Sequence, residues 1–270
     1  MKNLNSALQE ITQLNTSAHG SSVMHKLHPL AKLLLTIMYI AMLMSFGKYQ
    51  IFALAGMSIY LFIGFHLSQL SFKEGLWRLR LILPLVSMVG LANPFFDSHN
   101  FFVGGWTINA GWISFITLML KGIFAVMSSY LLIATTTIEQ ICYALRLLHL
   151  PKILVTQFLL TYRYLTLLLE QAETISQAYA LRAPKQKGIH FKAWGTLAGQ
   201  LLLRSIDRAN ALYDSMLLRG YHGEFYYGGT FAAWSKKDWR YLLSMCLLLL
   251  LLRLLPWSLL YTKLLGGKVL

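Results

Sequence analysis

Apolar runs that recur along the chain constrain its fold more than any other feature of the sequence. There are five of them, at residues 30–46, 51–67, 81–96, 112–137 and 241–261. A helix that crosses a membrane needs about 20 mostly apolar residues, and the shorter runs lie near the lower end of that range. Charged residues make up only 13% of the chain, whereas soluble domains have about a quarter. The sequence therefore predicts an all-α, polytopic membrane protein with about five transmembrane helices.

The charges between these runs predict how the chain lies in the membrane. Residues 71–80 carry three Lys or Arg and one acid, while residues 93–112 contain no Lys or Arg. Because basic loops stay in the cytoplasm, we expect a cytoplasmic loop at 71–80, an outer segment at 93–112 and a cytoplasmic N-terminus. We expect the membrane to be the cell inner (plasma) membrane. The net charge of +14 suits the lipid bilayer as a partner and not nucleic acid, since no basic face interleaved with aromatic residues is visible.

Residues 138–240 differ in character from the apolar runs. They hold 13 of the 24 Lys and Arg residues, and no run among them is long and clean enough to predict a span. We expect long amphipathic helices at 153–183 and 193–219 that cross one another beneath the membrane. The predicted organisation is a membrane part at 1–137 (an N-terminal lead-in and four spans), cytosolic helices at 138–240, and a last transmembrane helix at 241–270.

The two long amphipathic segments end in the same way. Each has an arginine in its last turn, followed by a residue that stops a helix: Arg182 precedes Pro184, and Arg219 precedes Gly220. Proline cannot continue a helix, and glycine suits the left-handed residue that closes many helices. Arginine at a helix C-terminus is favourable through the helix dipole by about 0.3–1 kcal/mol, which explains the pattern without any function.

The alternative explanation is that the two ends are similar plugs for two copies of one partner. An arginine that enters a groove can form a bidentate pair with a carboxylate, and a symmetric dimer offers two equivalent grooves. The candidate docking residues are Ala180, Leu181, Arg182, Ala183, Leu218, Arg219 and Gly220.

Lys121 is the one full charge inside the run at 112–137. A charge within a span usually faces protein or water. We therefore expect Lys121 to contact either a partner in the membrane or a neighbouring helix.

Residues that could catalyse a reaction or bind a metal form no recognisable pattern. The sequence has no G-x-x-x-x-G-K-[ST] phosphate loop, so we expect any ATP hydrolysis to be the work of a partner. His19, His25 and His28 precede the first run, but their spacing matches no compact metal motif. We predict that the chain is not an enzyme and has no catalytic residue, cofactor or metal site.

Motifs spread over most of the chain carry a resemblance to a known family. They are Leu27-His28-Pro29 with Lys32-Leu33-Leu34, Asn93-Pro94-Phe95-Phe96, Thr135-Thr136 with Glu139, Leu150-Pro151, Thr161-Tyr162-Arg163-Tyr164, Arg204-Ser205 with Arg208, and Ser215-Met216-Leu217-Leu218-Arg219-Gly220-Tyr221. With these motifs the sequence resembles the transmembrane T components of energy-coupling factor (ECF) transporters, in particular the cobalt-type, CbiQ-like members. It departs from them at His28 and Leu30, where an acid and a basic residue are usual. It also departs at both ends, Leu181-Arg182-Ala183 and Leu218-Arg219-Gly220, where Ala-Arg-Gly is common.

The resemblance implies a helical membrane part, a cytosolic coupling region of long crossed helices and a function in transport. It implies that Arg182 and Arg219 each dock in a groove of one of two ATP-binding (ATPase) subunits. A separate substrate-binding S component would lie against the membrane part. Closure of the ATPases on ATP would move the two helix ends together and so tilt or release the S component. The implied substrate is cobalt, with nickel close behind and a vitamin as a further alternative.

Two other functions remain open on the sequence alone. One is a membrane-embedded enzyme that acts on an anionic lipid. It would need converging polar residues at membrane depth, and the spans offer few beyond Lys121, Thr135 and Thr136. The other is a permease lined by its own substrate site, which predicts that the isolated chain binds substrate.

Overall fold

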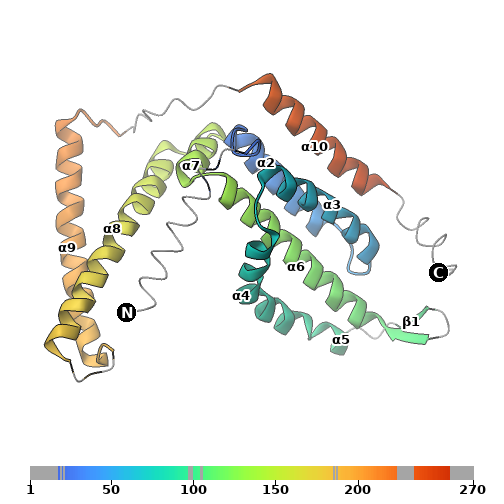
Figure 1. The fold of residues 1–270 in the computed structure, drawn as a ribbon, viewed down its shortest axis with the longest axis horizontal. Helices are drawn as coiled ribbons and strands as arrows, with labels where there is room; N and C mark the ends of the chain where they lie inside the picture. The colour runs from blue at the N-terminus through green and yellow to red at the C-terminus, as the bar shows by residue number, and fades with distance from the viewer. Residues whose placement is uncertain are drawn as a thin grey trace. The chain divides into compact units, whose positions relative to one another are not determined.

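A computed structural model describes residues 18, 20, 22–96, 100–103, 106–184, 186, 188–223 and 234–255 of the 270-residue chain. This part of the chain is helical apart from one short hairpin (Figure 1). The elements are α2 (Pro29–Met44), α3 (Ile51–Ser68), α4 (Phe72–Gly90), α5 (Asn93–Phe96), β1 (Asn100–Val103), β2 (Trp106–Asn109), α6 (Ala110–Thr135), α7 (Ile138–Leu147), α8 (Lys152–Arg182), α9 (Phe191–Leu218) and α10 (Lys236–Leu254). The predicted helical fold is confirmed, whereas the sequence did not predict the hairpin.

The chain divides into two compact units, each described by itself. Among the described residues, the core unit holds 18–136 and 234–255, and therefore α2 to α6, the hairpin and α10. The second unit holds 137–223 and therefore α7, α8 and α9; we call it the α7–α9 unit. The chain thus leaves the core unit after α6 and returns to it before α10.

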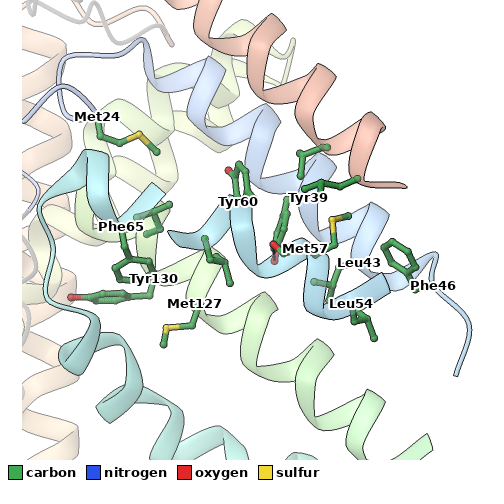
Figure 2. Close-up of a cluster of buried hydrophobic side chains, with 14 of the residues drawn as sticks. Met24, Tyr39, Leu43, Phe46, Leu54, Met57, Tyr60, Phe65, Met127 and Tyr130 are labelled. Carbon is green, nitrogen blue, oxygen red and sulfur yellow. Dashed lines mark hydrogen bonds between the residues drawn. The ribbon is translucent and has the colours of Figure 1, made fainter. Parts of the chain in front are cut away.

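Helix α6 is the centre of the core unit. Helices α2, α3, α4 and α5 all pack against it, and α10 packs on α2 and α3. The buried side chains among these helices include Tyr39, Met57 and Tyr60 (Figure 2). The rings of Tyr39 and Tyr60 stack with centroids 4.5 Å apart, and the Tyr39 hydroxyl donates to the carbonyl oxygen of Met57 at 3.3 Å. This packing joins α2 to α3 through an aromatic contact whose buried hydroxyl has a partner.

A glycine allows α5 to lie directly on the first turn of α6. An added Cβ at Gly111 would lie 2.4 Å from the Cα of Pro94, so only glycine leaves room for the backbone of α5. Small residues at such helix contacts are typical of membrane proteins. The amide of Asn93 adds a hydrogen bond from Nδ2 to Ser114 Oγ at 3.1 Å. The Asn93-Pro94 motif therefore serves to hold α5 against α6.

Helices α2 and α10 run parallel: hydrogen bonds join the N-terminal end of one to the N-terminal end of the other, and likewise the two C-terminal ends. At the N-terminal ends, the backbone N–H of His28 donates to Asp238 Oδ1 at 3.0 Å. At the C-terminal ends, Arg253 Nη2 donates to the carbonyl oxygen of Ser45 at 3.3 Å, and its guanidinium lies over the ring of Phe46. An acid at a helix N-terminus and a cation at a C-terminus both complement the helix dipole.

Two described helices, α6 and α8, are long and apolar enough to cross a membrane by length and composition. Two shorter apolar helices correspond to α2 and to residues 53–68 of α3. For α8 this differs from our expectation that residues 138–240 contain no spanning run. The reason is that the apolar first half of α8 raises the mean hydropathy of its most apolar stretch to 1.2, although the helix ends in polar residues. About five spans therefore remain a prediction.

We expected a loop at residues 71–80 and a turn at 104–105. The structure corrects the first expectation and does not describe the residues of the second. In place of the loop, Ser71 is the N-cap of α4 and residues 72–80 form its first half; the helix continues past Pro84. A charge pattern reports the side of the membrane and not the backbone conformation, so it could not exclude a helix here. Within residues 93–112, which we expected to face outward, β1 and β2 pair antiparallel. The turn that we expected at 104–105 lies outside the described residues.

The α7–α9 unit contains the two long helices that the sequence predicts. Helix α7 begins with a capping box, in which Thr137 Oγ1 accepts from the N–H of Gln140 at 3.3 Å and the Gln140 side chain accepts from the N–H of Thr137. Helix α8 has 31 residues and α9 has 28. The two helices contact one another near the connection between them and diverge beyond it (Figure 1). Their observed bounds differ from the predicted 153–183 and 193–219 by one or two residues at each end.

Candidate docking site

The first candidate docking end is the C-terminus of α8, which proline terminates. The residue before Pro184 is Ala183, whose φ of −128° and ψ of 63° lie outside the helical region, as expected for a residue that precedes proline. The helix therefore ends at Arg182. Its last turn is tied to the chain that follows, because the Tyr179 hydroxyl donates to Gln186 Oε1 at 2.8 Å and accepts from the N–H of His190 at 3.3 Å.

The second candidate docking end is the C-terminus of α9, which glycine terminates. Gly220 has a φ of +79°, the left-handed conformation that we expected. The N–H of Gly220 donates to the carbonyl oxygen of Leu217 at 2.9 Å, and that of Tyr221 donates to Met216 at 3.0 Å. This pair of hydrogen bonds defines a Schellman motif, which satisfies the last carbonyl groups of a helix. The two ends are thus closed by different devices and at different places relative to the arginine. Arg182 is the last residue of α8, whereas Arg219, which we expected in the last turn of α9, is the cap that follows it.

Both ends expose a leucine and an arginine side by side. Leu181 is 83% exposed and Leu218 is 90% exposed, and Arg182 and Arg219 are exposed as well. Among the described residues, no carboxylate forms an ion pair with either arginine. An exposed apolar side chain next to an unpaired guanidinium can bind a partner surface that offers an apolar pocket and a carboxylate. The remaining candidates are Ala180 and Ala183, which are half-buried, and Gly220, which is exposed.

The two ends lie far apart within the α7–α9 unit. Arg182 precedes the short connection to α9, whereas Arg219 lies at the opposite end of α9 (Figure 1). At about 1.5 Å per residue, a helix of this length is roughly 40 Å long. Two ends at this distance suit two separate grooves and not one.

Replacing Gly220 with alanine should loosen the second end without unfolding α9. The left-handed conformation costs an alanine roughly 1 kcal/mol, so we expect about five-fold faster hydrogen exchange at residues 219–221. Mass spectrometry of the exchanged peptides measures this. The control is Gly199→Ala, at a helical position with open space around the added Cβ, which should leave exchange at residues 219–221 unchanged. Equal exchange in Gly220→Ala and the native chain would contradict the role of Gly220.

Lys121 contacts a neighbouring helix, which is one of the two contacts that we expected for it. Its ammonium group donates to the carbonyl oxygen of Phe46 at 2.6 Å, just beyond the C-terminus of α2. The same helix end receives Arg253 from α10. Lys121 therefore joins α6 to a neighbouring helix inside the core unit.

A buried polar cluster that we did not predict lies at the N-terminus of α2. Lys32 is only 3% exposed, and its ammonium group donates to the carbonyl oxygen of Thr135 at 2.7 Å. Asp238 is 6% exposed and accepts from the N–H groups of His28 and Ser235. The sequence signal was present, since Lys32 lies inside the first apolar run and the reasoning applied to Lys121 applies to it equally.

His28 takes part in this cluster as a helix cap. Burial lowers the pKa of His28, and this effect outweighs the nearby Asp238 carboxylate, which raises it. A neutral imidazole fits the observed contact, in which Nδ1 accepts from the N–H of Leu30 at 3.3 Å. Within the described part of the chain, no group of three or more His, Cys, Asp or Glu side chains could hold a metal ion.

Comparison with known proteins identifies relatives of this chain. The profile of the cobalt transport protein family CbiQ matches residues 20–227. An uncharacterized protein of Methanocaldococcus jannaschii is 32% identical over 99 residues, which are 36% of this chain and 37% of the relative. The cobalt transport protein CbiQ of Salmonella typhimurium is 28% identical over 109 residues, which are 39% of this chain and 48% of the relative. The chain thus spans less than half the length of either relative.

Proposed function

The chain belongs to the cobalt transport protein family CbiQ, and from this membership we propose that it is the transmembrane T component of an ECF importer. It takes no part in the chemistry of ATP hydrolysis. It transmits the movement of two ATPase subunits to a membrane S component that binds the substrate. The substrate is cobalt, and nickel is the second candidate.

The observation that carries this proposal is the pair of exposed leucine–arginine ends. Each of Arg182 and Arg219 enters a groove of one ATPase subunit and pairs with a carboxylate there. The leucine before each arginine, Leu181 or Leu218, fills an apolar pocket beside that carboxylate. The distance between the ends lets one chain engage both members of an ATPase pair at once, so a closing movement of the pair acts on α8 and α9 together.

The topology proposed from the sequence is compatible with the parallel arrangement of α2 and α10. Two parallel spans enter the membrane from the same side, so a chain that begins with one and ends with the other crosses an odd number of times. Five spans satisfy this condition. We place them in the cell inner membrane, with the N-terminus in the cytoplasm. Two boundaries of the compact units, after residues 136 and 231, support the proposed division into a membrane part (1–137), coupling helices (138–240) and a last transmembrane helix (241–270).

Affinity purification of the tagged chain from its own cells tests the proposed function. We expect two related or identical ATPase subunits and one small hydrophobic membrane protein to copurify. Binding of radioactive cobalt or nickel to this small membrane protein would identify it as the S component and would identify its substrate. Substrate binding by the isolated chain would instead support a permease, and purification without any ATPase would refute the proposal.

A further inference from the structure

Both connections between the two units are fastened to the N-terminal turns of one helix, α2. The outgoing connection follows α6, whose last carbonyl oxygen, on Thr135, accepts from Lys32 at 2.7 Å. The returning connection precedes α10, whose Asp238 accepts from the N–H of His28 at 3.0 Å. These contacts join residues that are 103 and 210 positions apart in the sequence. They all lie within the core unit.

The hydrogen bonds that hold the two connections to α2 involve buried charged side chains, so these contacts are strong. Lys32 and Asp238 are both buried, and their opposite charges attract one another. The second oxygen of Asp238 accepts from the N–H of Ser235 at 2.9 Å, so the same carboxylate also closes the capping box at the start of α10. Hydrogen bonds that involve charged groups are stronger than neutral ones, and breaking one member leaves the other buried without its partner.

We propose that this cluster, Lys32, His28 and Asp238, is the point at which movement of the α7–α9 unit enters the core unit. The inference rests on the proposed function and adds the route of transmission to it. Helices α7 to α9 are joined to the described part of the core unit after α6 and before α10, so a displacement of these helices pulls on these two connections. Because both are held by α2, they displace α2 as a body. Lys32 and Asp238 are positioning residues that act through Thr135 and the start of α10.

The opposite end of α2 supplies a matched control. Lys121 also donates to a backbone carbonyl oxygen, that of Phe46, at 2.6 Å. It lies in the same unit as Lys32 and joins the same two helices, α6 and α2, but its contact is at the C-terminal end of α2, away from the residues that hold the two connections. Replacing either lysine with methionine removes a similar hydrogen bond and keeps an unbranched side chain of similar length. Only Lys32→Met should affect transmission.

The test compares the complete transporter with the native chain, Lys32→Met, Lys121→Met and Lys32→Arg in proteoliposomes. The measured quantity is the number of ATP molecules hydrolysed per cobalt ion taken up. Loss of a charged hydrogen bond corresponds to about 10-fold or more in an equilibrium, so we expect Lys32→Met to raise this ratio about 10-fold while the ATPases stay bound. Lys121→Met should keep the native ratio, and Lys32→Arg, which retains a cationic donor, should recover most of it.

The outcomes separate the two proposals. If the native complex shows no ATP-dependent uptake, the proposed function fails and this inference fails with it. If the native complex couples normally and Lys32→Met has the same ratio as Lys121→Met, only the inference is overturned. Asp238→Asn provides a second test should Lys32→Met not assemble, because the amide keeps an acceptor oxygen for His28 but loses the charge. It should also raise the ratio, and a native ratio in an assembled Asp238→Asn complex would overturn the inference.

Discussion

Replacing both Arg182 and Arg219 with alanine should abolish copurification of the ATPase subunits and reduce uptake to background. Removing one member of a desolvated charge pair at an interface costs about 2–5 kcal/mol. Each single replacement should therefore weaken binding of the ATPases by at least about 30-fold, and the double replacement should remove it. Affinity purification followed by quantitative mass spectrometry of the companions measures binding, and radioactive cobalt uptake measures function.

The control for this prediction is Arg146→Ala. Arg146 lies in the last turn of α7, which is also closed by a left-handed residue, His149 with a φ of +63°. It belongs to the same unit as the two docking arginines but is half-buried. We expect Arg146→Ala to retain the ATPases, and all three variants to insert into the membrane normally. Retention of the ATPases by the double variant would show that the two ends do not dock them.

Replacing Gly111 with alanine should destabilise the core unit more than any other single methyl addition at a glycine of α6. The added Cβ would lie 2.4 Å from Pro94 Cα, 2.9 Å from Pro94 N and 3.0 Å from the carbonyl oxygen of Asn93. All three atoms belong to the backbone, so α5 must move away from α6 as a whole. Such overpacking typically costs about 1–3 kcal/mol, which thermal unfolding of the purified protein in detergent would measure as a lower Tm.

The control for Gly111→Ala is Gly122→Ala on the same helix. An added Cβ at Gly122 would lie 3.3 Å from the side-chain methyl groups of Val86. A valine side chain can yield by a small movement, and alanine favours the helix over glycine by about 1 kcal/mol. We therefore expect a near-native Tm for Gly122→Ala. Equal Tm values for the two variants would show that the contact of α5 with α6 does not limit stability.

The long helices of the α7–α9 unit illustrate what can be predicted from sequence. Their ends depend on signals that act over a few residues: Pro184 cannot continue a helix, and Gly220 adopts the left-handed conformation that closes one. Both helices end within one residue of the predicted positions. The exposure of Leu181 and Leu218 could not be predicted in this way, because an apolar residue in an amphipathic segment ordinarily faces the core.

The beginning of the chain illustrates the opposite case. Periodicity and charge indicated an apolar helix after Pro29, and family motifs included Lys32 and Thr135, but nothing local joined these residues to Asp238. The hydrogen bonds that do so depend on α6 and α10 each packing against α2, which brings together residues far apart in the sequence.

The sequence by itself determined that this is a helical membrane protein of the CbiQ family, because hydropathy, helix-stopping residues and motifs are local properties of the chain. The tertiary structure alone decided which charged residues meet: Lys121 with the end of α2, and Lys32 and Asp238 with its beginning. The physical reason is that a buried charge must find a partner wherever packing provides one, and packing depends on all the helices at once.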